Sequence, residues 1–336
     1  MRLLAAAIGV SLAVAAPAPA AETVGRGGVT AGPVLTGGAV LWADAPSGTP
    51  RVLSGAPSRR PVVVGRWPAA RVRDTGRTVA ALAAAGDRAA AVVETCTTTV
   101  DGDAVFLGCA ERAFGGTPGG HFAPFGRPLP RRGPPGCSSP RAPVSVAAGI
   151  GVIAVAETPS CQGIARAAGR SRIVVHRGAA RQLIPSAGAT RLRMAGRYLA
   201  YLEGRRFPRG AVLYDLARRE RVRRVSGSTL QAVDVQADGT LALLRSDRAR
   251  TCVSVLRRGA AREQRVACGV AAPDVAIAGG RVLFTQGRRL VLARPGGRRR
   301  VLARPGGYGH FDLAPDRAAW TAGPPSGIQR IRVAAL

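Results

Sequence analysis

Short apolar runs alternate with polar or glycine-containing breaks along most of the chain. One element recurs, a Gly or Asp turn followed by a short strand of small apolar residues. Its copies occupy residues 37–44, 86–94, 149–157, 195–203, 237–247, 279–286 and 315–323. Alternation between turn signals predicts β-strands, and the spacing approaches the repeat of about 45 residues that is typical of a propeller blade.

A second hairpin lies between copies of this element. It is clearest at residues 173–185, 211–225, 252–266 and 290–303. One unit is therefore strand, turn, strand, loop, strand, turn, strand. This pattern predicts an all-β fold, a β-propeller with seven four-stranded antiparallel blades. Six blades with an irregular remainder is the alternative, and a pair of β-sandwiches is the second choice.

The last unit, residues 309–336, contains only three clear strands. Residues 22–30 follow a predicted signal peptide and have no unit of their own. We expect them to supply the missing fourth strand and so to close the ring.

Two stretches carry a family resemblance. VQADGTLALLRSD (235–247) and LAPDRAAWTAG (313–323) resemble the Pro-Asp-Gly turn of WD40-like, TolB-type propeller repeats. The hairpin VLYDLARRERVRRV (212–225) resembles the one that follows this turn. The likeness covers residues 189–336 well and 29–142 loosely, and many copies lack Pro-Asp-Gly, as in a divergent member. It implies the propeller fold and partner binding rather than a reaction.

Residues 1–20 have the features of a secretory signal peptide. Arg2 precedes an apolar run, and Ala18-Pro19-Ala20 forms an A-x-A cleavage site. We expect a secreted, extracellular protein whose residues 21–336 form one propeller domain. No later apolar run reaches membrane-spanning length. The Gly/Pro-rich stretch 110–143 breaks the repeat and is expected to be an insert.

The six cysteines are expected to form disulfides, because the chain is expected to be exported. Each sequential pair is symmetric about a predicted hairpin turn, which sets facing residues near the separation that a disulfide needs. The predicted bonds are Cys96–Cys109, Cys137–Cys161 and Cys252–Cys268.

The net charge of +30 comes from 49 basic residues, all arginine, against 19 acidic ones. Abundant Ala, Gly, Pro and Arg together are typical of a GC-rich genome, which favours a dispersed, solvated basic surface. A polyanion-binding face is the alternative. Aromatic residues make up only 4% of the chain, so platforms for stacking bases or sugars are scarce.

The second strands of the repeat end at one equivalent position, which is acidic in four consecutive units. The residues there are Asp44, Glu94, Glu157, Glu203, Arg245, Gln286 and Ala322. The acidic arc predicts a site for a cationic group or a metal ion. Pairing of each carboxylate with an arginine of its own or the next blade is the favoured alternative.

Histidines and the insert supply further candidates. His310, with Asp312 close in sequence, is a conceivable general base, but a structural role is favoured. His176 is expected to be structural. Clustered Phe122 and Phe125 in the insert predict a partner contact, with simple covering of a blade edge as the alternative.

The sequence contains no G-x-S-x-G, H-E-x-x-H, Walker or dinucleotide-binding motif. We therefore predict a monomeric, non-catalytic binding or scaffold module for a protein or cell-envelope component, with no cofactor and no metal. The alternatives are a propeller-type hydrolase or lyase that uses the acidic arc, and a polyanion-binding surface protein.

Overall fold

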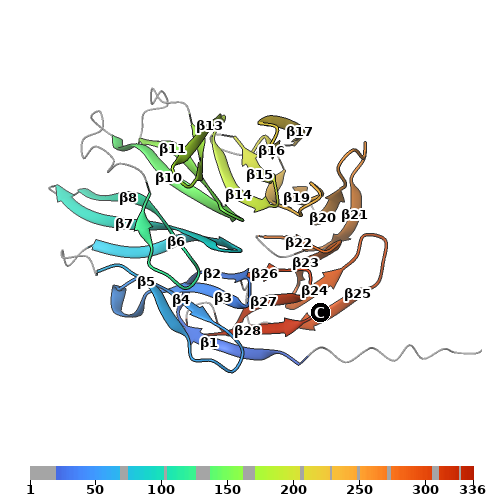
Figure 1. Ribbon diagram of the computed structural model, residues 1–336, viewed down its shortest axis with the longest axis horizontal. Coiled ribbons are helices and arrows are strands. Elements are labelled where there is room, and N and C mark those ends of the chain that lie inside the picture. The colour runs from blue at the N-terminus through green and yellow to red at the C-terminus, as the bar shows by residue number, and fades with distance from the viewer. Residues whose placement is uncertain are drawn as a thin grey trace, which may run out of the picture.

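The computed structural model describes residues 20–68, 75–101, 104–125, 137–161, 171–204, 208–227, 229–247, 250–270, 274–304, 310–324 and 327–336. They form seven four-stranded antiparallel sheets that follow one another around a central axis (Figure 1). The prediction of a seven-bladed β-propeller is confirmed, and the alternatives of six blades and of a sandwich pair are excluded.

Each blade runs from an inner strand at the axis to an outer strand at the rim. Blades 1 and 2 consist, in that order, of β2 (Val29–Thr36), β3 (Ala39–Asp44), β4 (Arg51–Gly55) and β5 (Val62–Arg66), then β6 (Thr75–Ala85), β7 (Arg88–Asp101), β8 (Ala104–Gly116) and β9 (Ala123–Pro124). Blades 3 and 4 consist of β10 (Cys137–Gly149), β11 (Val152–Cys161), β12 (Arg172–Arg177) and β13 (Ala180–Pro185), then β14 (Ala189–Ala195), β15 (Tyr198–Glu203), β16 (Gly210–Asp215) and β17 (Glu220–Ser226).

The remaining blades keep the same order. Blades 5 and 6 consist of β18 (Leu230–Val235), β19 (Leu241–Asp247), β20 (Arg250–Leu256) and β21 (Gln264–Cys268), then β22 (Ala276–Ala278), β23 (Arg281–Gln286), β24 (Arg289–Ala293) and β25 (Arg299–Ala303). Blade 7 consists of β26 (Phe311–Leu313), β27 (Arg317–Ala322), β28 (Gln329–Ala335) and β1 (Glu22–Gly27). A short 3₁₀ helix, η1 (Pro46–Gly48), links β3 to β4.

The two ends of the described chain close the ring within blade 7. Strand β1 pairs antiparallel with β28, from Glu22 opposite Val333 to Gly27 opposite Gln329. The predicted closure by the N-terminal segment is therefore confirmed, although Thr30 already belongs to β2 of blade 1. The side chain of Trp42, in β3, is fully buried against this closing strand at Gly25.

The hydrophobic core is divided among the contacts between blades. Among the described residues there are seven clusters of buried apolar side chains, one between each pair of neighbouring blades. Accordingly, the second strand of blade 4, YLAYLE, is buried along its whole length. The outer strand of the same blade, ERVRRVS, is largely exposed. A strand covered on both faces needs continuous apolar residues, whereas a rim strand tolerates arginines.

Two sequence predictions fall partly outside the described residues. Residues 1–19, most of the predicted signal peptide, and residues 126–136 of the Gly/Pro-rich insert lie there. The insert's first and last residues lie in β8 and β10. None of the helices in the described ranges has the length and apolar character needed to cross a membrane.

Candidate functional site

The inner strands of all seven blades surround a central channel with a volume of about 1150 Å³. One register position faces it in every blade, because each inner strand pairs with its second strand in the same way. That position lies opposite the residue three places before the equivalent position that Asp44, Glu94, Glu157, Glu203, Arg245, Gln286 and Ala322 occupy in the second strands. Its occupants from blade 1 to blade 7 are Val34, Leu82, Ala147, Arg193, Asp234, Ala276 and Asp312. The channel is thus apolar on one side and charged on the other.

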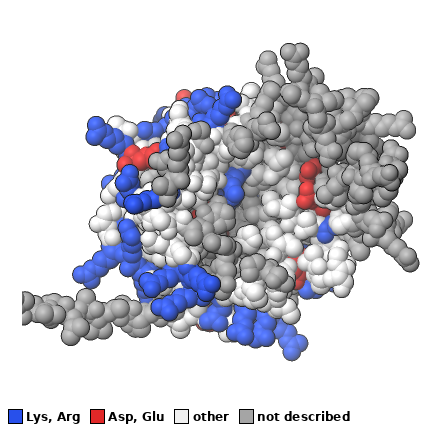
Figure 2. All heavy atoms as spheres, turned by 180° about the vertical axis from the view of Figure 1, so that it is seen from behind, with Lys and Arg blue, Asp and Glu red and all other residues white. Residues whose placement is uncertain are grey.

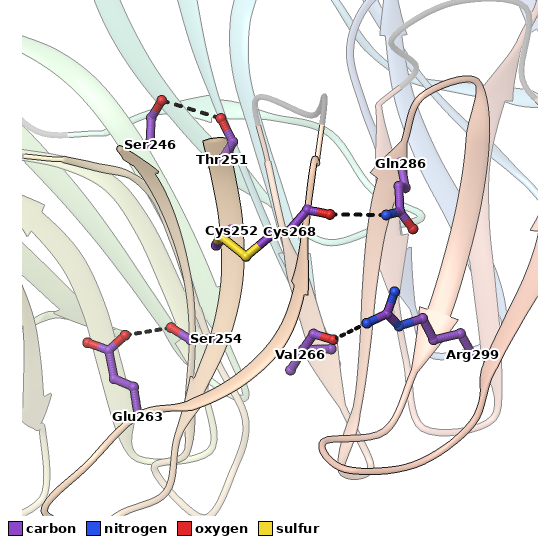
Figure 3. The surroundings of a disulfide bond; sticks show 9 residues. All are labelled: Ser246, Thr251, Cys252, Ser254, Glu263, Val266, Cys268, Gln286 and Arg299. Atoms are coloured by element: carbon purple, nitrogen blue, oxygen red, sulfur yellow. Dashed lines mark hydrogen bonds between the residues drawn. A yellow bond between two sulfur atoms is a disulfide. The ribbon is translucent and has the colours of Figure 1, made fainter. Parts of the chain in front are cut away.

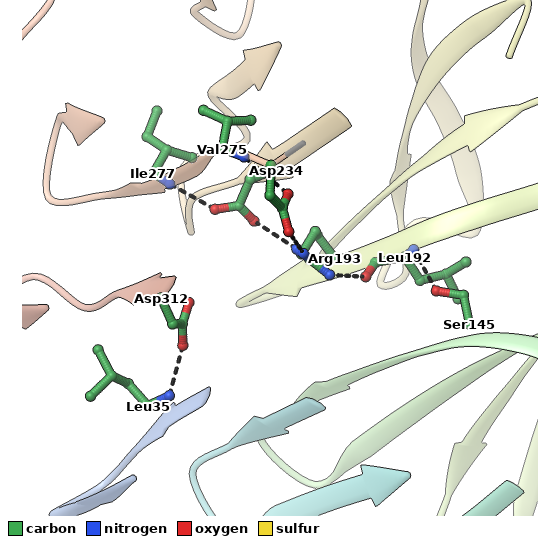
Figure 4. Close-up of polar contacts among 9 residues, drawn as sticks. Leu35, Ser145, Leu192, Arg193, Asp234, Val275, Ile277 and Asp312 are labelled. Carbon is green, nitrogen blue, oxygen red and sulfur yellow. Dashed lines mark hydrogen bonds and ion pairs between the residues drawn. The ribbon is translucent and has the colours of Figure 1, made fainter. Parts of the chain in front are cut away.

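Arg193 links acidic side chains on the charged side of the channel (Figure 4). Its Nη2 lies 2.7 Å from Oδ2 of Asp274, and its Nε lies 4.0 Å from Oδ1 of Asp234. Asp274 lies two residues before the inner strand of blade 6, so one guanidinium from blade 4 contacts acids from blades 5 and 6. Charged groups withdrawn from water are stable only when paired and hydrogen-bonded.

The carboxylates also hold neighbouring blades together through the backbone. The N–H of Ile277 donates to Asp234 at 2.7 Å, and the N–H of Leu35 donates to Asp312 at 2.7 Å. Burial raises the pKa of Asp234 to about 7 and that of Asp312 to about 6. These acids therefore act as interblade hydrogen-bond acceptors whose charge is costly to bury.

His310, considered from sequence as a general base, lines the same channel. Burial lowers its pKa, which the nearby charge of Asp274 partly opposes. Its carbonyl accepts a hydrogen bond from the N–H of Thr321 at 2.9 Å. Within the described ranges, no group of three or more His, Cys, Asp or Glu side chains is arranged to hold a metal ion.

Three of the four acidic-arc residues form ion pairs with arginines of their own blade. Asp44 lies 2.6 Å from Arg51 Nε, and Glu157 lies 2.7 Å from Arg172 Nε. Glu203 lies 3.2 Å from Nε of Arg224 on the outer strand. This geometry is the pairing that the sequence left open as the alternative. A ligand-binding role for these residues stays a prediction.

Blade 5 carries the same ion pair with its signs reversed. Arg245 occupies the position that is acidic in blades 1 to 4, and its Nη2 lies 2.6 Å from Oε1 of Glu263, next to the outer strand. Ser254 of the third strand donates to the same carboxylate at 2.6 Å. A charge pair at this position therefore recurs with either polarity, as expected for a tie within the blade.

Glu94 differs from the other arc residues. It lies in β7 directly opposite Glu111 in β8. Burial raises the pKa of Glu111, and the neighbouring charge of Glu94 raises it further. Two facing carboxyl groups, both partly buried, disfavour simultaneous ionisation.

The two phenylalanines of the insert pack against the blades on either side of blade 2. The ring of Phe122 makes an edge contact with Trp67 of blade 1, with centroids 6.0 Å apart. The ring of Phe125 lies 4.8 Å from the ring of His176 of blade 3. Both phenylalanines are half-buried, so part of each ring is already used in contacts between blades. The predicted partner contact stays a prediction.

The cysteine register agrees with the sequence symmetry. Cys252 and Cys268 face each other across β20 and β21 and form a disulfide, which confirms that pairing (Figure 3). Gln286 of blade 6 donates to the carbonyl of Cys268 at 3.0 Å.

The other two predicted cysteine pairs are also register partners. Cys96, which is disulfide-bonded, pairs with Cys109, and Cys137 pairs with Cys161. The bonds Cys96–Cys109 and Cys137–Cys161 stay predictions.

The channel charges were largely missed from sequence. Only His310 and Asp312 were considered, whereas Arg193, Asp234 and Asp274 were not. The available signal was the repeat itself. Alignment of the inner strands on their turns would have placed Arg193, Asp234 and Asp312 at one equivalent position.

Comparison with known proteins supports the fold alone. No family model matches the chain, and no curated protein matches it. A structure from a study of two prolyl endopeptidases is similar, with a TM-score of 0.50 and 13% identity over 89% of this chain and 45% of the other. An oligogalacturonate lyase in complex with manganese gives a TM-score of 0.46 and 10% identity, over 89% of this chain and 74% of the other. The Dos1 propeller gives a TM-score of 0.43 and 8% identity, over 88% of this chain and 75% of the other. This chain thus spans less than half of the prolyl endopeptidase structure.

Proposed function

We propose that this chain is a secreted β-propeller that binds a protein or cell-envelope component without catalysing a reaction on it. The observation that carries the proposal is that five carboxyl groups of the acidic arc and the channel are already engaged within the protein. Asp44, Glu157 and Glu203 are held by arginines of their own blades. Asp234 and Asp312 accept hydrogen bonds from the backbone of the next blade. Groups committed in this way stabilise a rigid platform.

Export is supported by the cysteines as well as by the signal-like N-terminus. The Cys252–Cys268 disulfide, and the register of the other two cysteine pairs, suit an oxidising compartment. The turns at 235–247 and 313–323 resemble those of WD40-like, TolB-type propeller repeats. This resemblance supports a partner-binding role.

The experiment is an affinity capture from an envelope extract of the source organism, with the exported, oxidised protein as bait. The chain has no lysine, so amine chemistry attaches it to a support only through its N-terminal amine. Washes at physiological and at high salt separate specific from purely ionic retention. One discrete component that survives high salt supports the proposal. An empty capture under both conditions argues against it.

A hydrolase or lyase function is the second candidate, and the facing Glu94 and Glu111 favour it. A carboxylic acid with a raised pKa beside a second carboxylate is a pattern that general acid–base pairs use. If the captured component is cleaved during incubation, Glu111→Gln should stop the cleavage without changing retention. Retention of an intact component disfavours this candidate.

A further inference from the structure

The hairpins at the rim of blades 4, 5 and 6 are unusually rich in arginine. We call residues 216–226, 257–265 and 294–304 the arginine rim. It contains fourteen arginines and two glutamates. Each segment holds the turn before the outer strand of its blade, together with all or the start of that strand.

Most of the arginine-rim side chains face solvent. The exposed ones are Arg218, Arg219, Arg221, Arg224, Arg257, Arg258, Arg262, Arg265, Arg294, Arg298, Arg299 and Arg304. Figure 2 shows basic side chains along the side of the molecule that these C-terminal blades form, with an acidic patch among them, and further basic side chains along the lower edge. Arginine is therefore denser in these three short segments than in the rest of the chain.

The three hairpins form one continuous surface. Arg223 of blade 4 donates from Nη1 to the carbonyl of Ala260 in the blade 5 turn at 2.5 Å. Arg299 of blade 6 donates from Nη2 to the carbonyl of Val266 in blade 5 at 2.8 Å. These contacts fix the spacing of the arginine rows across two blade boundaries. A ligand long enough to cross all three blades would meet positive charge along its whole path.

The two acids of the arginine rim neutralise little of it. Glu263 is engaged by Arg245, which lies outside the rim, and by Ser254. Glu220 lies 3.6 Å from Arg218, and both side chains are more than half exposed. An exposed pair of this kind contributes little and is screened by salt. Outside the rim, Glu203 engages Arg221 and Arg224. The surface still keeps a positive excess.

We propose that the arginine rim binds a linear phosphate polymer. The inference goes beyond the proposed function, because it adds a salt-sensitive ionic site to the contact that is expected to survive a high-salt wash. Guanidinium groups match phosphate oxygens in a bidentate fork, and arginine keeps its charge at all physiological pH values. The arginine rim contains no aromatic residue, so it has no platform on which nucleic-acid bases could stack. Recognition therefore acts through the charged phosphate backbone of the polymer. In a nucleic acid, the bases would add nothing to the affinity.

The test compares two charge-matched variants with long-chain inorganic polyphosphate as the probe. The rim variant carries Arg257→Gln, Arg262→Gln, Arg265→Gln and Arg298→Gln. The control variant carries Arg26→Gln, Arg59→Gln, Arg60→Gln and Arg66→Gln, all exposed residues of blades 7 and 1, away from blade 5 in the ring (Figure 1). Thermal unfolding of each variant establishes that both are folded before binding is measured.

Binding is measured by fluorescence anisotropy at several salt concentrations. For the native protein, the logarithm of the affinity should fall linearly with the logarithm of salt concentration, because each phosphate contact releases counterions. Each rim arginine removed should reduce that slope by about 0.7 to 1. The rim variant should therefore lose affinity by at least about tenfold at low salt, whereas the control variant should bind nearly as well as the native protein.

Three results would overturn the proposal. Equal losses in the two variants would mean that net charge alone attracts the polymer. A flat salt response would exclude ionic contacts. Much tighter binding of single-stranded DNA than of polyphosphate with equal charge would show that bases are read. If the capture experiment still retains a discrete partner, these results remove the arginine-rim proposal and leave the proposed binding function standing.

Discussion

The ion pair between Asp44 and Arg51 gives a quantitative test of whether the acidic arc is structural. Asp44 is only 2% exposed, and Arg51 is 29% exposed. Both oxygens of the carboxylate are used, with Arg51 Nε at 2.6 Å and Nη2 at 3.0 Å. The closing strand covers the carboxylate, because a side chain at Gly27 would lie 2.6 Å from Oδ2. Asp44 therefore depends on Arg51 for its compensation, whereas Arg51 can reach water.

This asymmetry predicts unequal effects for the two single substitutions. Arg51→Gln leaves a buried, unpaired carboxylate and should lower the free energy of unfolding by about 3 to 5 kcal/mol. Asp44→Asn leaves an arginine that water can solvate and should cost about 1 to 2 kcal/mol. The double substitution should be close to Asp44→Asn alone, and therefore less harmful than Arg51→Gln.

The assay is urea unfolding at pH 7, followed by tryptophan fluorescence, since Trp42 is fully buried in the neighbouring core. The four proteins form a double-mutant cycle that isolates the coupling between the side chains. A coupling of about 2 kcal/mol or more is expected for this geometry. Equal and additive losses from the two single variants would refute the reasoning. A stabilised Asp44→Asn variant would instead indicate a carboxylate kept for ligand binding at the expense of stability.

Three further predictions concern the closure, the disulfide and the channel. Gly25→Ala should lower the free energy of unfolding by about 1 to 3 kcal/mol, because the added carbon overlaps the buried Trp42 ring. Gly28→Ala, at a position with open space around it, is the control. Equal urea midpoints for the two variants would count against the packing argument. Replacing both Cys252 and Cys268 by Ser should lower the free energy of unfolding by about 3 kcal/mol, as expected for a closed loop of this length. A melting temperature that is unchanged in oxidising buffer would contradict this prediction. In the folded state the pKa of Asp234 is raised to about 7 from an ordinary 3.8. The folded state therefore binds more protons than the unfolded state between these two pH values. The free energy of unfolding should fall as pH rises through that window, by up to roughly 1.4 kcal/mol per pH unit. Asp234→Asn should flatten this fall in urea midpoints between about pH 4 and 7. An equally steep slope in the variant would remove the assignment.

The blade architecture was predictable because residues close together in the sequence determine each blade. Turn residues followed by short apolar strands recur within each unit, and the symmetry of Cys252 and Cys268 about their turn gave the register directly. Closure by the segment after residue 20 followed from the missing fourth strand of the last unit.

The channel charges were harder to predict because their partners are distant in sequence. Asp312 accepts a hydrogen bond from Leu35, 277 positions away, and Asp234 from Ile277, 43 positions away. Irregular pairing in several inner strands, such as the register shift between Thr190 and Arg193, also disturbs simple alternation. Which arginine pairs with which acid likewise depends on cross-strand neighbours, so the sequence left both readings of the acidic arc open.

The most direct test of the central claim is the state of the partner after capture. The native protein should retain a discrete envelope component through a high-salt wash, and prolonged incubation should return that component with unchanged mass. This outcome is expected of a propeller that binds without catalysis. A retained component that is cleaved or otherwise altered by the native protein would contradict the account.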